Sequence, residues 1–537
     1  MTVRHPLIWV TLLMLLAFAV LTPPPDHVID TQLRLRVTRA MLETGTLEID
    51  NDPAFSHLTP QSPNGRHYCV YPIGQSLVLL PLDSTAKTLS YVIPVGAIEQ
   101  RTLRDCLTAW MYFWTINGLL ALAVYGVLRR LRLSRRSAAL GTLAVFFTSL
   151  WLIWSRSMQE ETLAALLLVS ALYFGLRGAQ SGGVGRSGLV IGALFGLLAN
   201  VRYNGAFAAL GVMVWVLAAC PDMKSRVRLV VAAAAVLIPA LGLAGWYNTL
   251  RFGSAAETGY QAYGASIGRS WAFNLADFGA LTGGSDFGLL WFALPLLLLP
   301  FAFAGKRRTL VIGVCALGVT LLLHVIFLSG FFMHEPGGHF GYCGPRYLAH
   351  GAILLAIPGW VGARAAMRMG RRLPLAPRLA AIALAAGALF QLAGVPLQAE
   401  IERYQDAMAN YAETPPPRPA AYVPRRFKNL LIAATGKIRE ETVPEKIREP
   451  GKLDDLTAER IANACTPNLL PWRLPLQGRP HAVLPAWLIA AVSALWWAAL
   501  AGLVGMMLVG LRRLTSRSPM RPATGQNPPA DKTGQTA

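Results

Sequence analysis

The sequence has few charged residues for its length, and acidic residues are the scarcer kind. Only 14% of the 537 residues are charged, with 49 lysines and arginines against 28 aspartates and glutamates. A soluble enzyme of this size needs a larger charged surface, so this scarcity, together with 54% hydrophobic residues, excludes that class. The net charge of +21 does not indicate a nucleic-acid partner, because the basic residues lie mainly beside apolar stretches. We expect a polytopic membrane protein that contacts membrane lipids and binds no nucleic acid.

Cysteine is also scarce, and no CxxC pair occurs. This absence argues against a zinc or thiol-redox motif. Three of the six cysteines (Cys69, Cys343 and Cys465) fall in segments that we expect outside the cytoplasm. A disulfide is chemically allowed there, but the sequence does not say which cysteines would pair.

What the sequence does have is a series of long apolar stretches, which predicts an all-α protein with about 12 transmembrane helices. The loops between them alternate in charge, and by the positive-inside rule the arginine-rich loops are cytoplasmic. Twelve spans place both termini on the cytoplasmic side. A tight turn at 201–204 separates two of the spans, and a single longer helix there is the alternative. The predicted spans are 6–22, 107–128, 137–155, 160–177, 187–201, 204–220, 229–247, 287–304, 309–331, 347–363, 379–397 and 483–510.

The segments on the opposite, outer face contain the long insertions and most of the unusual residues. The first outer loop, 23–105, is too long for a simple connector, and long loops are often functional. Helical spacing of apolar residues predicts amphipathic helices at about 30–42 and 73–82, suited to lie in the membrane interface. The predicted units are a transmembrane catalytic unit (1–397, including the first loop), a small outer segment (398–482), a last span (483–510) and a disordered cytoplasmic tail (511–537).

Three acidic residues at the outer ends of predicted helices are candidates for chemistry. Asp30 begins the first amphipathic helix, where it suits an N-cap, a catalytic base, or both. Glu160 and Glu161 open the fourth span, where adjacent acids are costly unless they are hydrated or paired. They fit either a site role or a simple complement to the helix dipole.

Two arginines and a glycine-rich loop complete the outer candidates. Arg202 and Arg346 lie at the outer surface, against the general charge bias. Snorkelling explains such arginines, and so does contact with a phosphate group. The loop 334–347 contains His339 among two histidines, a glutamate and a cysteine, but its spacing fits no common zinc pattern. We therefore predict no metal site there, and Arg346 is the better candidate as an anion contact.

Short motifs recur through these outer segments in a fixed order, and together they resemble bacterial GT-C membrane glycosyltransferases, the group of protein O-mannosyltransferases and the lipid A aminoarabinose transferase. The resemblance covers roughly residues 1–360. Its motifs are Asp30 with 37–47, then 65–77, Tyr247-Asn248, 251–254, 258–260, and 337–347.

The resemblance implies a GT-C-like fold in a bacterial inner membrane and transfer of a sugar from a polyprenyl-phosphate donor, with inversion, to a lipid, glycan or protein acceptor on the periplasmic face. The family's two outer acids correspond to Asp30, as base, and Glu161, and its basic residue at the end of the fifth span to Arg202. Many relatives have an acidic pair in the first loop, but here Thr31 follows Asp30. That departure puts in doubt a metal held by such a pair, and the use of a divalent cation stays open.

The chemistry is also consistent from the residues alone. Arg202 and Arg346 would neutralise a leaving phosphate, and Asp30 would accept a proton from the acceptor. We expect the donor or acceptor pocket to include Tyr71, Glu160, Tyr260 and His339. The rival classes are a transporter or lipid flippase, an O-antigen ligase-type enzyme and an inactive scaffold. Clustering of the charged candidates at one outer face argues against transport, because transport sites are expected near the bilayer midplane.

Overall fold

The structure is a computed structural model, and most of the helical bundle is described. Among the described residues there is no strand, only an isolated bridge between Gln61 and His67. The predicted all-α class is therefore confirmed. The described residues are 6–24, 29–51, 56, 58–259, 272–284, 288–305, 308–331, 346–396, 401, 405, 422–435, 437–438, 442, 461–462, 465–476 and 484–515.

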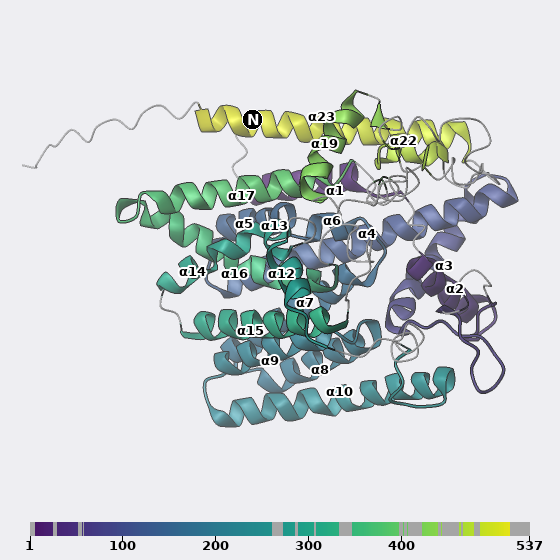
Figure 1. The fold of residues 1–537 in the computed structure, drawn as a ribbon, viewed down its shortest axis with the longest axis horizontal. Coiled ribbons are helices and arrows are strands. Elements are labelled where there is room, and N and C mark those ends of the chain that lie inside the picture. The colour runs from purple at the N-terminus through teal and green to yellow at the C-terminus, as the bar shows by residue number, and fades with distance from the viewer. Residues whose placement is uncertain are drawn as a thin grey trace, which may run out of the picture.

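Long helices run in one general direction through the molecule (Figure 1). Within the described residues, eight are long and apolar enough to cross a membrane, and two shorter apolar helices, α1 (Pro6–Leu21) and α9 (Gly205–Ala219), accompany them. Because these ten helices correspond to ten predicted spans, the multi-pass organisation is confirmed. The eight are α4 (Ala97–Arg130), α7 (Glu160–Ser181), α8 (Val184–Val201), α10 (Met223–Phe252), α15 (Arg308–Phe331), α16 (Ala349–Arg368), α17 (Leu375–Ala393) and α23 (Ala486–Thr515).

The other two predicted spans are not continuous helices. The stretch 137–155 is divided into α5 (Arg135–Thr148) and α6 (Trp151–Ser155). The stretch 287–304 is divided into four short pieces, two of which begin next to a proline. Proline has no N–H to donate and clashes with the preceding turn, so it starts helices and interrupts them. The pieces are α13 (Leu289–Phe292), η2 (Leu294–Leu298), α14 (Leu299–Ala302) and η3 (Phe303–Gly305).

Helices α8 and α10 pack backbone to backbone. A Cβ added to Gly188 would lie 2.6 Å from the carbonyl oxygen of Leu229, and one added to Gly192 would lie 2.2 Å from that of Ala233. Small residues four apart allow such close approach between membrane helices. After this contact α8 ends at Val201, and the chain turns into α9 at Gly205, so the predicted separation of the two spans is confirmed.

The first outer loop forms two helices, α2 (Ile29–Glu43) and α3 (Gly74–Val92), at one end of the bundle beside the extended start of α4 (Figure 1). Both predicted amphipathic helices are present, and the second ends ten residues later than expected, at Val92. They are joined through Asp83, which is fully buried. Its carboxylate accepts hydrogen bonds from Arg39 of α2 (3.3 Å) and from Arg104 and Thr108 of α4 (both 3.1 Å). Asp105 of α4 also pairs with Arg39 at 2.5 Å.

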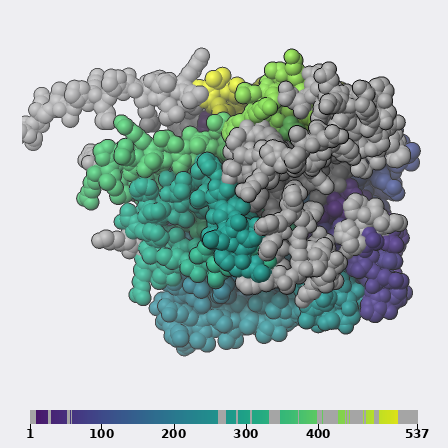
Figure 2. Space-filling view, in the orientation of Figure 1, coloured from purple at the N-terminus to yellow at the C-terminus, as the bar shows by residue number. Residues whose placement is uncertain are grey.

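The end of α10 holds the segment between α2 and α3. Arg251 Nη1 donates to the carbonyl oxygens of Cys69 (3.0 Å), Val70 (2.7 Å) and Tyr71 (2.8 Å). Figure 2 shows this part of the first outer loop, in purple, against the end of α10. Cys69 is buried, and its thiol is free. The other four described cysteines also have free thiols, and Cys343 lies outside the described residues. Hydrogen bonds therefore hold the described part of the first outer loop against the bundle.

The remaining described elements are short or lie near the C-terminal outer segment. Most of that segment falls outside the described residues, so its division from the transmembrane unit stays a prediction. These elements are α12 (Leu275–Gly283), η4 (Arg346–Leu348), η5 (Met369–Arg371), α19 (Tyr422–Ala434), α22 (Leu470–Arg473) and η7 (Leu474–Leu476).

Replacing Asp83 with alanine should destabilise the first outer loop. The change leaves Arg39 and Arg104 without their shared buried acceptor, at a cost of about 3 kcal/mol. Thermal unfolding of the purified protein in detergent should therefore shift to lower temperature. Asp50→Ala, at an exposed position of the same loop, is the matched control and should change stability by less than about 0.5 kcal/mol. Equal melting of the Asp83 variant and the wild type would contradict the role given to this carboxylate.

Candidate functional site

The candidate site begins where α7 starts, directly after the break that follows α6. Glu160 and Glu161 form the first turn of α7 and are 4% and 0% exposed. The start of a helix favours acidic side chains, because free backbone N–H groups and the helix dipole present positive charge there. That effect alone is small beside the cost of burying two carboxylates. Their burial therefore requires cationic partners.

Arg202 provides the first of these partners, from the C-terminal end of α8. Its Nη1 lies 2.6 Å from Glu161 Oε1 and 3.2 Å from Glu160 Oε1. Its Nε donates to the side chain of Asn204 at 2.7 Å, and its guanidinium lies 4.8 Å from the centre of the Tyr347 ring. Arg202 is only 4% exposed, so it does not reach out toward the aqueous surface as a snorkelling arginine would.

Arg346 joins all three candidate acids. It lies at the start of η4, where its Nε donates to Glu161 Oε1 and its Nη2 pairs with Asp30 Oδ2 at 3.0 Å and with Glu160 Oε1 at 3.5 Å. Residues separated by up to 316 positions in the sequence therefore meet around one guanidinium group. The fold therefore brings together the five charged residues that were selected from the sequence: Asp30, Glu160, Glu161, Arg202 and Arg346.

Asp30 lies in the first turn of α2, one residue after the helix begins at Ile29. Its Oδ1 accepts a hydrogen bond from the Tyr71 hydroxyl, and its Oδ2 faces Arg346. The Asp30 side chain is 15% exposed, compared with 5% for Glu160 and 1% for Glu161. Asp30 is thus the most accessible of the three carboxylates. Tyr71, expected in the pocket, holds it directly.

The site contains a third arginine that the sequence analysis missed. Arg34 lies one helical turn after Asp30 on α2, its Nη2 is 2.9 Å from Glu160 Oε2, and its guanidinium lies 4.3 Å from the centre of the Tyr71 ring. Burial opposes the charge on Arg34, but Glu160 and Asp30 outweigh it and raise the pKa of Arg34 above its usual range. Its spacing of four residues from Asp30 was the available signal.

The six charged groups balance one another. Asp30, Glu160 and Glu161 contribute three negative charges, and Arg34, Arg202 and Arg346 contribute three positive charges. Some hydrogen-bonding capacity is left over. Glu161 Oε2 and Arg202 Nη2 are buried and have no hydrogen-bond partner among the described residues. Buried polar atoms are usually satisfied, so an unused guanidinium N–H at this site is suited to an anionic ligand.

The three carboxylates do not form an obvious metal site. Each one already faces an arginine, and the described residues contain no group of three or more histidine, cysteine or acidic side chains placed to hold a metal ion. A cation would have to compete with these guanidinium groups for the same oxygens. Two further predicted pocket residues, Tyr260 and His339, lie outside the described residues. Their roles stay predictions.

The chain is similar to one protein family and to several solved structures. Residues 110–246 match the family of dolichyl-phosphate-mannose-protein mannosyltransferases. No protein of curated function matches the sequence. Among solved structures, the apo form of ArnT from Cupriavidus metallidurans is similar, with 16% identity, 81% of this chain and 76% of that chain covered, and a TM-score of 0.45.

Two further solved structures are similar at comparable levels. ArnT from the same organism bound to undecaprenyl phosphate has 13% identity, with 82% of this chain and 80% of that chain covered and a TM-score of 0.40. The oligosaccharyltransferase of Archaeoglobus fulgidus with zinc and sulfate has 12% identity, with 77% and 58% covered and a TM-score of 0.42. The segment that matches the family model includes Glu160, Glu161 and Arg202, and this match confirms the predicted resemblance to the GT-C membrane glycosyltransferases.

Proposed function

We propose that the chain is an inverting membrane glycosyltransferase that moves a sugar from a polyprenyl-phosphate donor to an acceptor on the outer, periplasmic face of a bacterial inner membrane. The observation that carries this proposal is the contact of Arg346 with both Asp30 and Glu161. The guanidinium group of Arg346 is suited to bind phosphate, and it lies directly against the partly accessible carboxylate of Asp30. The family match over 110–246 supports the same reaction class.

In the proposed reaction, an acceptor hydroxyl or amine attacks the anomeric carbon of the donor sugar. The bond between that carbon and the phosphate oxygen breaks, and the lipid phosphate leaves with the bonding electrons. Arg202 and Arg346 stabilise the charge that develops on the phosphate, since guanidinium groups bind phosphate oxygens in a two-point geometry. Asp30 accepts the proton lost by the acceptor. Attack from the side opposite the leaving phosphate inverts the configuration of the sugar.

The paired charges give donor binding a second role. Arg346 Nη2 lies 3.0 Å from Asp30 Oδ2. A donor phosphate that binds Arg346 competes with this contact. Donor binding would therefore release Asp30 Oδ2 to accept a hydrogen bond from the acceptor. The Tyr71 hydroxyl keeps the carboxylate in place during the exchange.

In this reaction we give Glu160 and Glu161 a different role from that of Asp30. The Glu161 side chain is only 1% exposed and faces two arginines, so we assign it to positioning Arg202 and Arg346 and not to direct proton transfer. Glu160 does the same for Arg34 and Arg202. The carboxylates thus hold the arginines in a fixed arrangement before the donor arrives, which lowers the cost of binding the phosphate.

Replacing Asp30 with asparagine should abolish most of the transfer while leaving the fold intact. Asparagine keeps the shape and still suits the start of a helix, but it cannot accept the acceptor's proton. We expect the rate of sugar transfer from radiolabelled polyprenyl-phosphate sugars in membranes to fall by about 100-fold or more. Asp50→Asn is the matched control and should retain activity. Transfer at the wild-type rate by Asp30→Asn would reduce Asp30 to a structural role.

Replacing Arg346 with lysine should weaken donor binding. Lysine keeps the charge but cannot contact two phosphate oxygens in the geometry of a guanidinium group. The KM for the lipid-linked donor should rise by about 10-fold or more, corresponding to loss of one charge-assisted hydrogen bond, while the KM for the acceptor changes little. Arg101→Lys, at an exposed position on the outer part of α4, is the control. A change confined to the acceptor KM would contradict a phosphate contact, and uptake into vesicles without any transfer would favour a transporter.

A further inference from the structure

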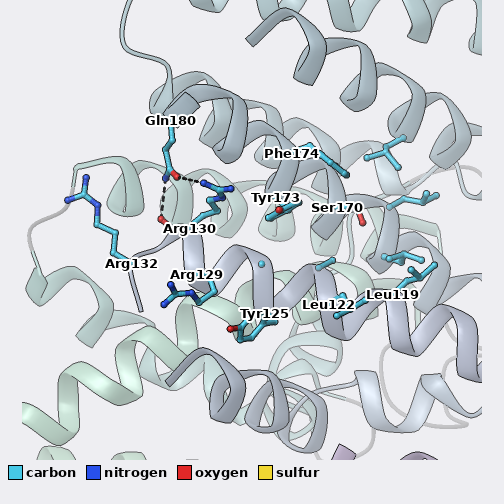
Figure 3. A pocket seen from close by; sticks show the side chains of 15 residues that line it. Leu119, Leu122, Tyr125, Arg129, Arg130, Arg132, Ser170, Tyr173, Phe174 and Gln180 are labelled. Atoms are coloured by element: carbon cyan, nitrogen blue, oxygen red, sulfur yellow. Dashed lines mark hydrogen bonds between the residues drawn. The ribbon is translucent and has the colours of Figure 1, made fainter. Parts of the chain in front are cut away.

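A groove unrelated to the charged cluster lies between α4 and α7. Its volume is about 760 Å³, and its walls come from the second half of α4 and the turn after it, between Leu119 and Arg132, from α7 between Leu166 and Gln180, and from Leu194 of α8 (Figure 3). The candidate site lies at the other end of α7, at Glu160. At 1.5 Å per residue, the twenty residues from Glu160 to Gln180 separate the two ends by about 30 Å.

The two ends of the groove differ in chemistry. Leucine side chains line one end, and among them Leu119 and Leu122 are 48% and 68% exposed, on a helix long and apolar enough to cross a membrane. Arg129, Arg130 and Arg132 gather at the other end (Figure 3). None of the described residues that line the groove is acidic. The groove is thus apolar at one end and has three arginines, with no acidic residue among the described lining residues, at the other. This arrangement is complementary to a lipid with an apolar chain and an anionic head group.

The arginine end is held in position by specific contacts. Gln180 Nε2 donates to the backbone carbonyl of Arg130 at 3.2 Å, and Arg130 Nη1 lies 3.4 Å from Gln180 Oε1. The Arg130 guanidinium also lies 5.8 Å from the centre of the Tyr173 ring. This ring packs onto α4 at Gly126, where an added Cβ would lie 2.7 Å from it. The contacts join the end of α4 to the end of α7 beside the groove.

Arg132 adds an unusual backbone conformation. Its φ is +64°, and it is the one non-glycine residue with a positive φ in the part of the chain that is described. L-residues rarely adopt this left-handed region, which glycine and asparagine occupy more easily. The turn that follows α4 nevertheless has an exposed arginine at this position, so the third cation lies at the edge of the groove.

We propose that this groove binds one anionic phospholipid, with its phosphate at Arg129, Arg130 and Arg132 and an acyl chain along the leucine-lined end. Basic pockets between membrane helices recognise anionic head groups in this way. The lipid-linked sugar donor is a poorer occupant, because its phosphate would lie about 30 Å from Glu160 and Glu161. The bound lipid would bridge α4 and α7 and so stabilise the helix that begins with these glutamates.

The test is native mass spectrometry of the purified full-length protein with added phosphatidylglycerol or phosphatidylcholine of matched acyl chains. We expect one phosphatidylglycerol to bind at least tenfold more tightly than phosphatidylcholine. In the triple variant Arg129→Gln, Arg130→Gln, Arg132→Gln, that affinity should fall by about 100-fold, at about fivefold per arginine. The control triple variant Arg368→Gln, Arg372→Gln, Arg378→Gln removes the same charge from exposed positions outside the groove and should retain the tight binding.

A second variant separates a built site from general attraction of a basic surface for anionic lipid. Ser170 lines the groove on α7, and Ser170→Phe fills the groove without changing any charge. We expect this variant to lose the tightly bound phosphatidylglycerol as well. Equal binding of both phospholipids, equal loss in the two triple variants, or unchanged binding by Ser170→Phe would each overturn the proposal. Displacement of phosphatidylglycerol by equimolar polyprenyl phosphate would overturn the choice of a phospholipid as the occupant.

Discussion

The pairing of three carboxylates, two of them buried, with three arginines at one end of the helical bundle is the interaction on which the candidate site depends. Glu160 and Glu161 would be costly at the start of a membrane helix without Arg34, Arg202 and Arg346. The arginines, in turn, are buried only because the acids surround them. Neither set is stable in this position alone, so the cluster acts as one unit, and removing any single member leaves an uncompensated charge.

This cluster can form only if the first outer loop lies against the bundle. Asp30 and Arg34 belong to α2, which is not among the described helices that are long and apolar enough to cross a membrane. The buried Asp83 joins α2 to α4, and Arg251 joins the following segment to α10. The order of membrane spans does not determine where an outer loop packs. Contacts of this kind fix its position against the bundle. They hold the described part of a loop of about eighty residues against the helices beside it.

Residue type and topology together were enough to select charged residues that lie close together in the fold. Asp30, Glu160, Glu161, Arg202 and Arg346 were each unusual for the outer end of a predicted helix, and they meet in space. Arg34 was missed because, in an amphipathic helix, an arginine is expected to face solvent, and only its partner on α7 buries it. The buried Asp83 was missed for the same reason. The partners of Arg34 and Asp83 lie on other helices, so the sequence around each residue does not identify the pairing.

The broken helices were missed for a different reason. Hydropathy over 287–304 is high enough for a span, and it does not register how often proline interrupts the backbone hydrogen bonds. The separation of α8 from α9 was predicted correctly, because loop charges continue to alternate past it. Charge alternation reports on topology, while the continuity of a helix depends on backbone hydrogen bonding.

The balance of charge in the cluster has a consequence for selectivity. Because its three positive and three negative groups cancel, the site projects little net field into the surrounding water. Free phosphate or a soluble sugar phosphate would gain little from long-range attraction to it. A phosphate tethered to a lipid needs no such attraction, because confinement to the membrane keeps its effective concentration high. The site would then favour lipid-linked donors because the membrane confines them near it. It would not attract anions from solution.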